Sequence, residues 1–246
     1  MMRQAHLKAV AMDPEDPKPT TLAESAYRRL REDVLCGVIK PGEKIRIDQL
    51  AERYQMGTSP IRECMSRLAA EGLLVAEGQR GYWVALVSRE DFRDITGLRV
   101  SFETQALALS IDHGDIAWES EVVASFHRLS RIDKHLPERF DLGSDWEREN
   151  RAYHAALISR CPSKWLLRFT STLYDQSERY RRGSIAKQPI PGTIVQRAHK
   201  SIMDAALGRD KDKACAALAK HIETAARQVE KNLFSRIGPG EPQDGQ

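Results

Sequence analysis

Three histidines in the second half of the sequence have the type and the setting to bind a metal ion. His154 follows Asn150 by four residues, so the two share one face of a predicted helix. His199 and His221 lie on two later predicted helices, each among apolar residues. Imidazole nitrogens bind Zn²⁺ and other late first-row divalent ions, and the Asn150 side-chain oxygen would be a neutral fourth ligand. Open positions on such an ion would take water or the carboxylate of a small acid.

The same spacing has a second interpretation, in which the three histidines are core side chains with internal hydrogen bonds. On spacing alone this is the commoner situation for histidines at core-adjacent helical positions. The positions belong to different helices that are far apart in the chain, so the pattern by itself leaves both interpretations open.

A second set of polar residues lies on a predicted helix after Gly57, the second of two short helices in residues 50–74. Its apolar residues recur at helical spacing: Ile61, Met65 and Leu68. Its other face carries hydroxyls and an arginine: Thr58, Ser59, Arg62 and Ser66. A helix that presents such groups from its N-terminal half can enter the major groove of DNA, where an arginine bonds guanine or phosphate.

A predicted β-hairpin follows this helix pair directly. Residues 73–77 and 81–87 are short β-like runs, joined by a glycine-containing loop at 78–81. A hairpin in this position is a wing, and its tip can reach phosphate or the minor groove. The residues expected to contact DNA are Arg46, Thr58, Ser59, Pro60, Arg62, Gln79, Arg80 and Gly81.

The remaining elements are predicted to be helices. Thr21 and Asp48 can cap helices that begin at Leu22 and Gln49, and Ser88 begins a capping box. Six helical segments follow, at about 89–112, 115–135, 141–160, 163–182, 191–207 and 210–233. The fold class is therefore mainly α: a winged helix-turn-helix of three helices and a two-stranded wing, then an all-α bundle of about six helices. The predicted domains are residues 20–86 and 87–233, between flexible tails at 1–19 and 234–246.

Composition fits a water-soluble globular chain rather than a membrane protein. The chain has 246 residues, 41% of them hydrophobic and 30% charged, and no apolar run approaches the roughly 20 residues of a membrane span. Four scattered cysteines form no CxxC pair and are expected as small buried residues in a reducing cytoplasm. Residues 20–86 hold ten Lys/Arg and nine Asp/Glu, a net charge of +1, so DNA binding requires those charges to be placed asymmetrically.

Taken together, these motifs resemble the GntR-type transcription factors of the FadR subfamily, which carry an FCD C-terminal domain. Residues 56–65, MGTSPIRECM, are similar to the recognition-helix pattern of that family, and residues 80–84, RGYWV, to its wing. The opening of the second domain is matched by Leu98, Arg99 and Glu103. Its histidine motif is matched by Asn150, Tyr153 and His154, with His199 and His221 as the two later histidines.

The resemblance implies a homodimer that binds a palindromic operator and is released by a small carboxylate. In such family members an Asp-His-His-His set holds a divalent metal, which in turn holds the effector. It therefore implies a metal, expected to be Zn²⁺ with Ni²⁺ or Mn²⁺ as alternatives, at Asn150, His154, His199 and His221. Two departures matter: Asn150 replaces the aspartate and removes one negative charge, and Thr58 replaces an arginine in the DNA-reading helix.

The effector itself is expected to be an organic acid. Residues 160–167 and 175–181, RCPSKWLL and DQSERYR, resemble stretches of a carbon-starvation, glutarate-responsive branch, which implies a dicarboxylate. Arg99 is a candidate anchor for its carboxylate, with Glu103 beside it. The alternative role of Arg99 is a structural salt bridge with Glu103, four residues on.

Two other classes of protein were weighed. A three-histidine site could serve a metal-dependent hydrolase or lyase, but the chain has no HExxH, nucleophile elbow or phosphate loop, so no catalytic residue is predicted. A helical adaptor that binds protein would more often present an apolar docking face than the hydroxyl and arginine face that includes Arg62. The prediction is a transcription regulator that acts as a repressor and is not an enzyme.

Overall fold

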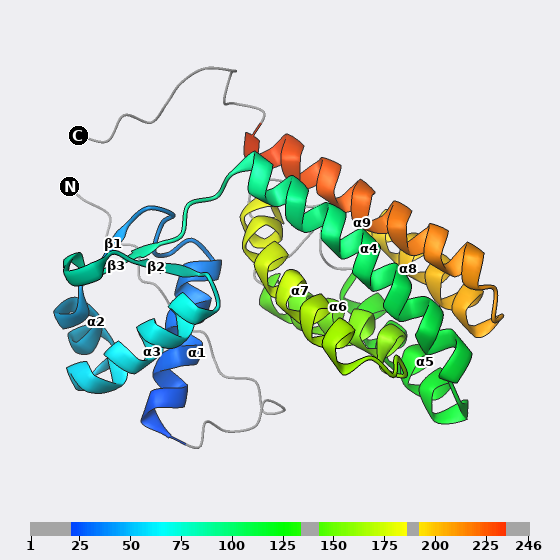
Figure 1. Cartoon of the computed structure of the whole chain (residues 1–246), viewed down its shortest axis with the longest axis horizontal. Coiled ribbons are helices and arrows are strands. Elements are labelled where there is room, and N and C mark those ends of the chain that lie inside the picture. Colours follow the sequence, from blue (N-terminus) through cyan, green and yellow to red (C-terminus); the bar gives the residue numbers. More distant parts are fainter. Residues whose placement is uncertain (1–20, 134–142, 186–191, 235–246) are drawn as a thin grey trace.

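The computed structural model describes residues 21–133, 143–185 and 192–234. The predicted tail at 1–19 lies outside this part of the chain, as does all of the predicted C-terminal tail except Phe234, which ends the last helix. The described elements fall into two groups, a small unit with a sheet and a bundle of longer helices (Figure 1). The fold is mainly α, as the sequence predicts.

The N-terminal unit begins with α1 (Leu22–Leu35), α2 (Ile47–Tyr54) and α3 (Thr58–Ala70). The Thr21 hydroxyl accepts a hydrogen bond from the backbone N–H of Glu24, which confirms the predicted cap. The prediction for Asp48 was wrong, because α2 begins one residue before it with Arg46 at the capping position. Asp48 lies instead in the first turn, where its charge favours the positive end of the helix dipole.

The sheet has one strand more than the predicted wing. β2 (Leu74–Ala76) and β3 (Tyr82–Val84) form the hairpin, with a 3₁₀ turn, η1 (Gly78–Arg80), between them. β1 (Lys44–Ile45), predicted only as an extended piece, pairs antiparallel with β3, which gives the order β1-β3-β2. The wing is thereby fixed on both sides of β3 and attached to the chain before α2.

A continuous apolar core holds α1, α2, α3 and the sheet together. Ile61, Met65 and Leu68 on α3 are fully buried, as their spacing predicts. Cys64 is buried on the same face, whereas Cys36 is exposed, so the prediction that all four cysteines are buried was wrong for Cys36. Cys36 follows the last residue of α1, and its thiol contacts the polar side chains of Glu32 and Arg182 rather than the core.

The C-terminal unit consists of α4 (Arg89–His113), α5 (Ile116–Asp133), α6 (Gly143–Ile158), α7 (Lys164–Ile185), α8 (Gly192–Leu207) and α9 (Lys211–Phe234). The Ser88 hydroxyl accepts a hydrogen bond from the Asp91 N–H, as predicted for the start of α4. α7 runs three residues past its predicted end at 182, and a Cβ at Gly183 would lie 3.5 Å from Leu233 of α9. Among the described residues, no helix is both long and apolar enough to cross a membrane.

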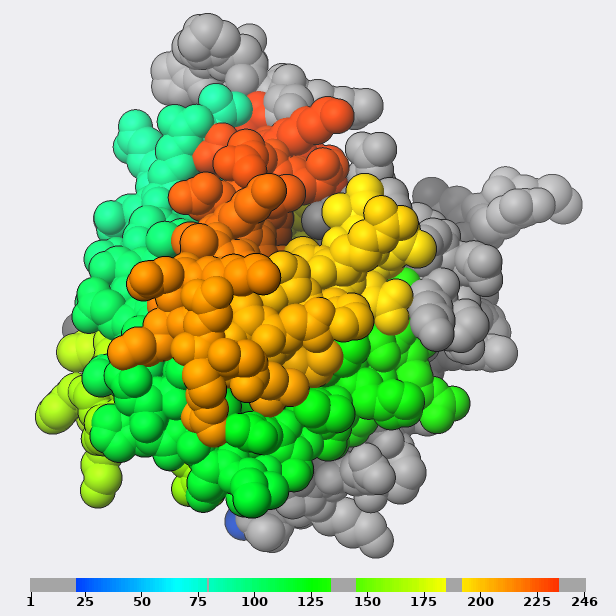
Figure 2. All heavy atoms as spheres, turned by 90° about the vertical axis from the view of Figure 1, so that its right-hand side faces the viewer, coloured from blue at the N-terminus to red at the C-terminus, as the bar shows by residue number. Residues whose placement is uncertain are grey.

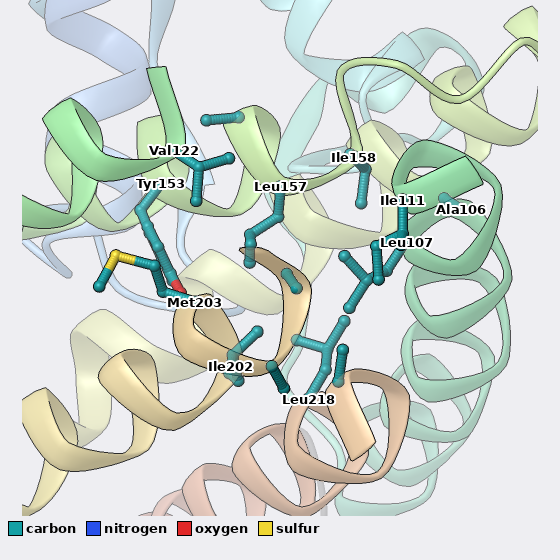
Figure 3. Packing of buried hydrophobic residues seen from close by; sticks show 14 of the residues in the cluster. Ala106, Leu107, Ile111, Val122, Tyr153, Leu157, Ile158, Ile202, Met203 and Leu218 are labelled. Atoms are coloured by element: carbon teal, nitrogen blue, oxygen red, sulfur yellow. The ribbon is translucent and has the colours of Figure 1, made fainter. Parts of the chain in front are cut away.

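The core of this unit brings together side chains from five helices. Figure 3 shows Leu107 and Ile111 of α4 facing Leu157 of α6, with Ile202 of α8 and Leu218 of α9 below. In Figure 2, α8 and α9 lie side by side across one face of the unit, above α5. The candidate histidines are carried by α6, α8 and α9, so the packing of these helices decides whether the histidines meet.

The two units contact each other through α1 and the C-terminal half of α7. Glu178 on α7 pairs with Arg31 of α1 at 3.2 Å, and Arg182 pairs with Glu32 of α1 at 2.6 Å. Gln176 donates a hydrogen bond to the backbone carbonyl of Glu71, at the end of α3. The DNA-reading helix and α7 are therefore in direct contact.

Candidate metal centre and nucleic-acid interface

The structure brings His154, His199 and His221 together inside the helical unit. One ring nitrogen from each lies within 4.8 Å of the others. The ring centroids of His199 and His221 are 4.5 Å apart, and each lies under 6 Å from the ring of His154. His154 and His199 are buried and His221 is partly buried. Nitrogens on one tetrahedral zinc lie roughly 3.4 Å apart, so small side-chain rotations would bring the three onto one ion.

Glu103 orients the His154 ring. Its Oε2 lies 3.1 Å from His154 Nδ1, while its Oε1 accepts from the Arg99 guanidinium at 2.7 Å. A carboxylate on Nδ1 favours the tautomer that carries its proton there and leaves Nε2 free to bind a metal. The Arg99–Glu103 salt bridge left open by the sequence is thus formed, and Glu103 has a role that the sequence did not reveal.

His199 is held by its backbone rather than by its ring. The Tyr153 hydroxyl donates to the His199 carbonyl at 2.7 Å, and neither ring nitrogen has a hydrogen-bond partner. Asp133 Oδ2, at the end of α5, lies 3.8 Å from His199 Nδ1, beyond hydrogen-bond distance, and is also unpartnered. Trp146 fixes the other Asp133 oxygen at 2.8 Å.

Asn150 lies one turn before His154 on α6. Its amide nitrogen donates to the Tyr174 hydroxyl at 2.6 Å, which orients the amide, and its Oδ1 is buried without a partner. Buried polar atoms are nearly always satisfied in proteins, so the unpartnered Asn150 oxygen and His199 nitrogens fit a role as ligands. One cation could bind a single nitrogen of the His199 ring, together with an oxygen ligand.

The electrostatics of the site keep His154 and His221 neutral. Burial lowers the pKa of His154 to about 4, although the Glu103 carboxylate opposes the shift. Burial, followed by the neighbouring histidines, holds the pKa of His221 well below its ordinary value. Burial acts to raise the pKa of Glu103, but Arg99 and His154 outweigh it and bring that pKa to about 2. Neutral imidazoles are the form that binds metal.

Tyr174 and two buried arginines line the same region. The guanidinium carbons of Arg99 and Arg181 lie 5.0 and 4.4 Å from the centre of the Tyr174 ring. Arg181 pairs with Glu147 at 2.9 Å, and both arginines donate to the Ser177 hydroxyl. Sequence reasoning did not single out Tyr174 or Arg181, since only tertiary packing places them near the histidines.

This arrangement is suited to holding an ion and an anion. Glu103 and Glu147 are each engaged by an arginine, but a general base requires a carboxylate free to accept a proton from a substrate. Asp133 keeps one oxygen, Oδ2, without a partner, 3.8 Å from His199 Nδ1. The choice against the hydrolase or lyase alternative therefore depends on the relatives described below.

The predicted DNA-contacting residues lie on one exposed side of α3 and at the wing. Thr58, Ser59, Arg62 and Ser66 are exposed, and Pro60 is partly buried. Gly57 occupies the capping position of α3 without a side-chain cap, so the first backbone N–H groups of the helix remain available to an anion.

The wing is tied to the same helix. The Ser66 hydroxyl lies 3.2 Å from the Tyr82 hydroxyl on β3. Arg80 is exposed at the tip, and Gly81 has φ = +113°, a backbone conformation that favours glycine. Arg46 is exposed at the start of α2. The side chain of Gln79 lies outside the described part of the chain.

Comparison with known proteins matches each of the two units to a protein family. Residues 22–84 match the bacterial regulatory proteins of the gntR family, and residues 94–224 match the FCD domain. The chain is 39% identical, over 85% of its length and 85% of the relative's, to the uncharacterized HTH-type transcriptional regulator BphR of Paraburkholderia xenovorans (strain LB400). It is 31% identical to the HTH-type transcriptional repressor GlaR of Escherichia coli (strain K12), over 83% of this chain and 94% of that protein.

A solved structure shares the fold. Escherichia coli McbR/YncC aligns with 86% of this chain and 98% of its own, with a TM-score of 0.68 and 18% sequence identity. At that identity the likeness concerns the fold alone.

Proposed function

This chain belongs to the gntR family of bacterial regulatory proteins and carries an FCD domain, and from that premise we propose a ligand-gated repressor whose helical unit binds a small carboxylate through a divalent metal. The family makes it a DNA-binding transcription regulator and not an enzyme. Within it, we assign DNA binding to residues 20–86 and effector binding and dimerisation to residues 87–233. We place its action in the cytoplasm, where its operator would be.

For DNA recognition, the proposal rests on the exposed side of α3. Arg62, in the second turn, is placed to read a base edge or a phosphate, while Thr58 and Ser59 sit at the helix N-terminus, where backbone N–H groups favour a phosphate. Arg80 at the wing would reach an adjacent phosphate or the minor groove. Two copies on one duplex would read a palindromic operator, so we propose a homodimer as the functional unit.

For the metal, we assign His154, His199, His221 and Asn150 as ligands, with Zn²⁺ expected and Ni²⁺ or Mn²⁺ as alternatives. The observation that supports the assignment is the cluster of one ring nitrogen from each histidine within 4.8 Å of the others, in which the ring of His199 has no hydrogen-bond partner. Once bound, the ion would supply a positive charge that attracts a carboxylate. All four ligands are neutral, so the site repels an anionic effector less than one with a ligating aspartate would.

For the effector, we propose an organic acid, with a dicarboxylate as the first candidate. A second carboxylate would need a cationic partner beyond the metal, and the buried guanidinium of Arg99 lies close to the histidines. Arg99 already pairs with Glu103, so binding would require the acid to share or replace that salt bridge. As an anchor, Arg99 would therefore exchange the Glu103 carboxylate, at least in part, for a carboxylate of the acid.

The route from effector to DNA follows side-chain contacts already present. A row of side chains connects His154 to Arg31 of α1 through Glu103, Arg99, Ser177 and Glu178. Ser177 and Glu178 are consecutive in the chain, and every other step is a contact of 3.2 Å or less. The segment before α4 docks beside it, because the Ser88 N–H donates to the Tyr180 hydroxyl at 3.4 Å. An effector that moves Arg99 can thereby bias how α1 sits on α7, and it shifts DNA affinity only by its differential affinity for the two arrangements.

Metal analysis and ligand screening test this proposal together. We expect about one divalent ion per chain in protein purified without chelator, and loss of that ion in a His154→Ala/His199→Ala variant. C3–C6 mono- and dicarboxylates should raise the melting temperature of metal-loaded protein by mass action and leave the variant unchanged. Full acid response in metal-free protein would exclude the metal, and no response to any acid would exclude the carboxylate effector.

A further inference from the structure

We propose that Asp133, at the end of α5, is a positioning residue for His199: its unpartnered oxygen accepts the Nδ1–H of that imidazole and leaves Nε2 to bind the metal. The inference rests on the metal site proposed above and adds a residue outside its ligand set. Among the residues that the structure describes, the histidines form the group whose ligand atoms lie within 4.8 Å of one another, and Asp133 is not a member of it. Its role is therefore to hold a ligand rather than to bind the ion.

Asp133 is a buried carboxylate with one oxygen in use and one without a partner. Its side chain is fully buried, and Trp146 Nε1 donates to its Oδ1 at 2.8 Å. Its Oδ2 has no hydrogen-bond partner. Within the described part of the chain, the basic side chain that approaches it is His199, and no lysine or arginine pairs with it. A buried carboxylate without a positive partner is costly in free energy, so its presence indicates a donor or a cation nearby.

His199 is the complementary half of this pair. Its ring is fully buried, and neither of its nitrogens has a hydrogen-bond partner. Its Nδ1 lies 3.8 Å from Asp133 Oδ2, so a shift of about 1 Å in either side chain would form a hydrogen bond. That bond requires the proton of the neutral ring to be on Nδ1, because a carboxylate can only accept.

A metal ion would select this arrangement. A neutral imidazole that binds an ion through one nitrogen carries its proton on the other. Since the Nδ1 of His199 lies toward Asp133, Nε2 is the nitrogen left for the ion. The Nδ1–H then needs an acceptor, and Asp133 Oδ2 needs a donor. One hydrogen bond satisfies both groups, as the outer partners of metal-binding histidines commonly do.

The same site already contains one carboxylate in this role. Glu103 Oε2 lies 3.1 Å from the Nδ1 of His154. The two carboxylates differ in charge balance, because Glu103 also pairs with Arg99 at 2.7 Å, whereas Asp133 has no such partner. Asp133 therefore supplies an uncompensated negative charge next to a ligand set in which Asn150 is neutral. It would stabilise a bound cation without placing that charge among the ligands, where it would repel an anionic effector.

Backbone contacts fix the two side chains relative to each other. A Cβ at Gly192, the first residue of α8, would lie 1.7 Å from the backbone oxygen of Asp133, so the end of α5 and the start of α8 are in direct contact. About two turns along α8, the His199 carbonyl accepts a hydrogen bond from the Tyr153 hydroxyl at 2.7 Å. Because both backbones are held, closing the gap is left to rotation of the side chains.

Nitrogen-15 NMR of the histidine side chains tests the assignment in full-length, Zn²⁺-loaded protein. The His199 signals are identified by their absence from a His199→Gln spectrum. We expect His199 to bind Zn²⁺ through Nε2, with an Nδ1–H proton that resonates far downfield and exchanges slowly with water. Asp133→Asn keeps the size of the side chain but removes its charge, so it should move this proton upfield and speed its exchange. Binding through Nδ1, or an unchanged Nδ1–H signal in Asp133→Asn, would overturn the proposal.

Zinc affinity supplies the second measurement, by competition with a chromogenic chelator. Asp133→Asn should bind Zn²⁺ about 10- to 100-fold more weakly than the wild type. Trp146→Phe is the matched control, because it removes the hydrogen bond to Oδ1 and leaves the charge and the oxygen nearest His199 in place. The control should keep the wild-type affinity. Equal losses in the two variants would show that Asp133 acts through packing alone and would overturn its positioning role.

The wild type separates this inference from the metal site on which it rests. A wild type that binds no Zn²⁺ would reject both. A wild type that binds Zn²⁺, with an Asp133→Asn variant of equal affinity, would reject the role of Asp133 and keep the metal site. If Asp133→Asn does not fold, the wild-type spectrum still decides, because it shows which nitrogen of His199 binds the ion.

Discussion

At the scale of single residues, the candidate metal centre depends on Glu103 as much as on its ligands. The Glu103 carboxylate holds the Nδ1 side of His154 and compensates the buried charge of Arg99. It also supplies a negative charge beside the histidines, whereas Asn150, the proposed fourth ligand, has none. Outer partners of this kind raise the basicity of an imidazole ligand and fix its orientation.

Replacing Glu103 by glutamine should therefore weaken the metal site without removing a ligand. We expect the Glu103→Gln variant to bind Zn²⁺ about 10- to 100-fold more weakly, measured by competition with a chromogenic chelator. Glu147→Gln is the matched control, because Glu147 compensates the other buried arginine, Arg181, and does not touch a histidine. Equal losses of metal affinity in the two variants would assign the effect to general destabilisation instead.

Arg62 carries the second prediction at this scale. It is exposed in the second turn of α3, so its removal should not disturb folding. Arg62→Ala should cost about 1–3 kcal/mol of operator binding, which is roughly 5- to 150-fold in Kd, measured by fluorescence anisotropy. Arg227→Ala, an equally exposed arginine on α9, should leave the Kd unchanged. An Arg62→Ala variant with wild-type affinity would remove α3 from the recognition surface.

Single residues also show where sequence reasoning stops. The histidines could be selected from the sequence because their types and helical settings are unusual, and Asn150 because it shares a face with His154. Asp133 and Tyr174 could not, because an aspartate and a tyrosine on separate helices carry no local signal of a shared site. Glu103 was selected as an effector contact, and its observed partners are Arg99 and His154.

At the scale of elements, local signals predicted most of the helices. Hydroxyl caps at Thr21 and Ser88 and glycine or proline breaks placed the helix ends within a few residues. The differences at helix ends are small, as at Gly183, where α7 continues three residues past its predicted end beside α9. The third strand was missed because a two-residue strand is stabilised by its pairing with β3 rather than by its own sequence.

Gly192 permits the close approach of α8 to the end of α5. A Cβ at this position would lie 1.7 Å from the backbone oxygen of Asp133, so any side chain must push the two helices apart. Gly192→Ala should destabilise the protein by about 1–3 kcal/mol or more, measured by urea unfolding. It should also disturb His199, which α8 carries.

Gly183→Ala is the comparison for this prediction. Its Cβ would meet Leu233 at 3.5 Å, an ordinary contact, and its gain in helix propensity should leave the stability equal or slightly higher. If the two alanine variants were equally stable, the close contact between α8 and α5 would not be a constraint in solution.

The contact between α1 and α7 has a predictable pH dependence because Glu178 is at its centre. Burial disfavours its charge, but Arg31 and Arg182 outweigh burial and hold the pKa of Glu178 at about 2, below the ordinary 4.5. A carboxyl with a lowered pKa contributes stability that is fully present above pH 4.5 and is lost as the pH falls toward 2.

Glu178→Gln should consequently reduce the unfolding free energy at neutral pH by about 3 kcal/mol, because several buried guanidinium groups lose their shared partner. The difference from wild type should shrink as the pH falls from about 5 toward 2, because the carboxyl of the unfolded chain, with the ordinary pKa of 4.5, binds a proton before the native one does. Urea titrations of both proteins at each pH measure this difference in unfolding free energy. A difference that stays constant over this range would show that the Glu178 charge is not stabilising.

At the scale of the whole molecule, the two units share one polar network, which the sequence did not predict. Arg31 and Glu178 look like ordinary surface charges on separate predicted helices, yet Glu178 is only 3% exposed. The network begins at α1, which packs against α3, and ends beside the histidines. Effector binding and DNA binding are therefore expected to be linked through it.

Linkage makes this expectation quantitative. If the acid changes operator affinity by some factor, the operator must change the affinity for the acid by the same factor, commonly 5- to 150-fold.

Arg31→Met removes the α1 end of the network but touches neither the histidines nor the exposed side of α3. We expect this variant to retain both separate affinities within a few-fold while the coupling factor falls toward one. Titrations of the protein with the acid by calorimetry, with and without saturating operator, measure this coupling factor. Wild-type coupling in the variant would mean that the effector acts through another path, such as the chain segment between β3 and α4.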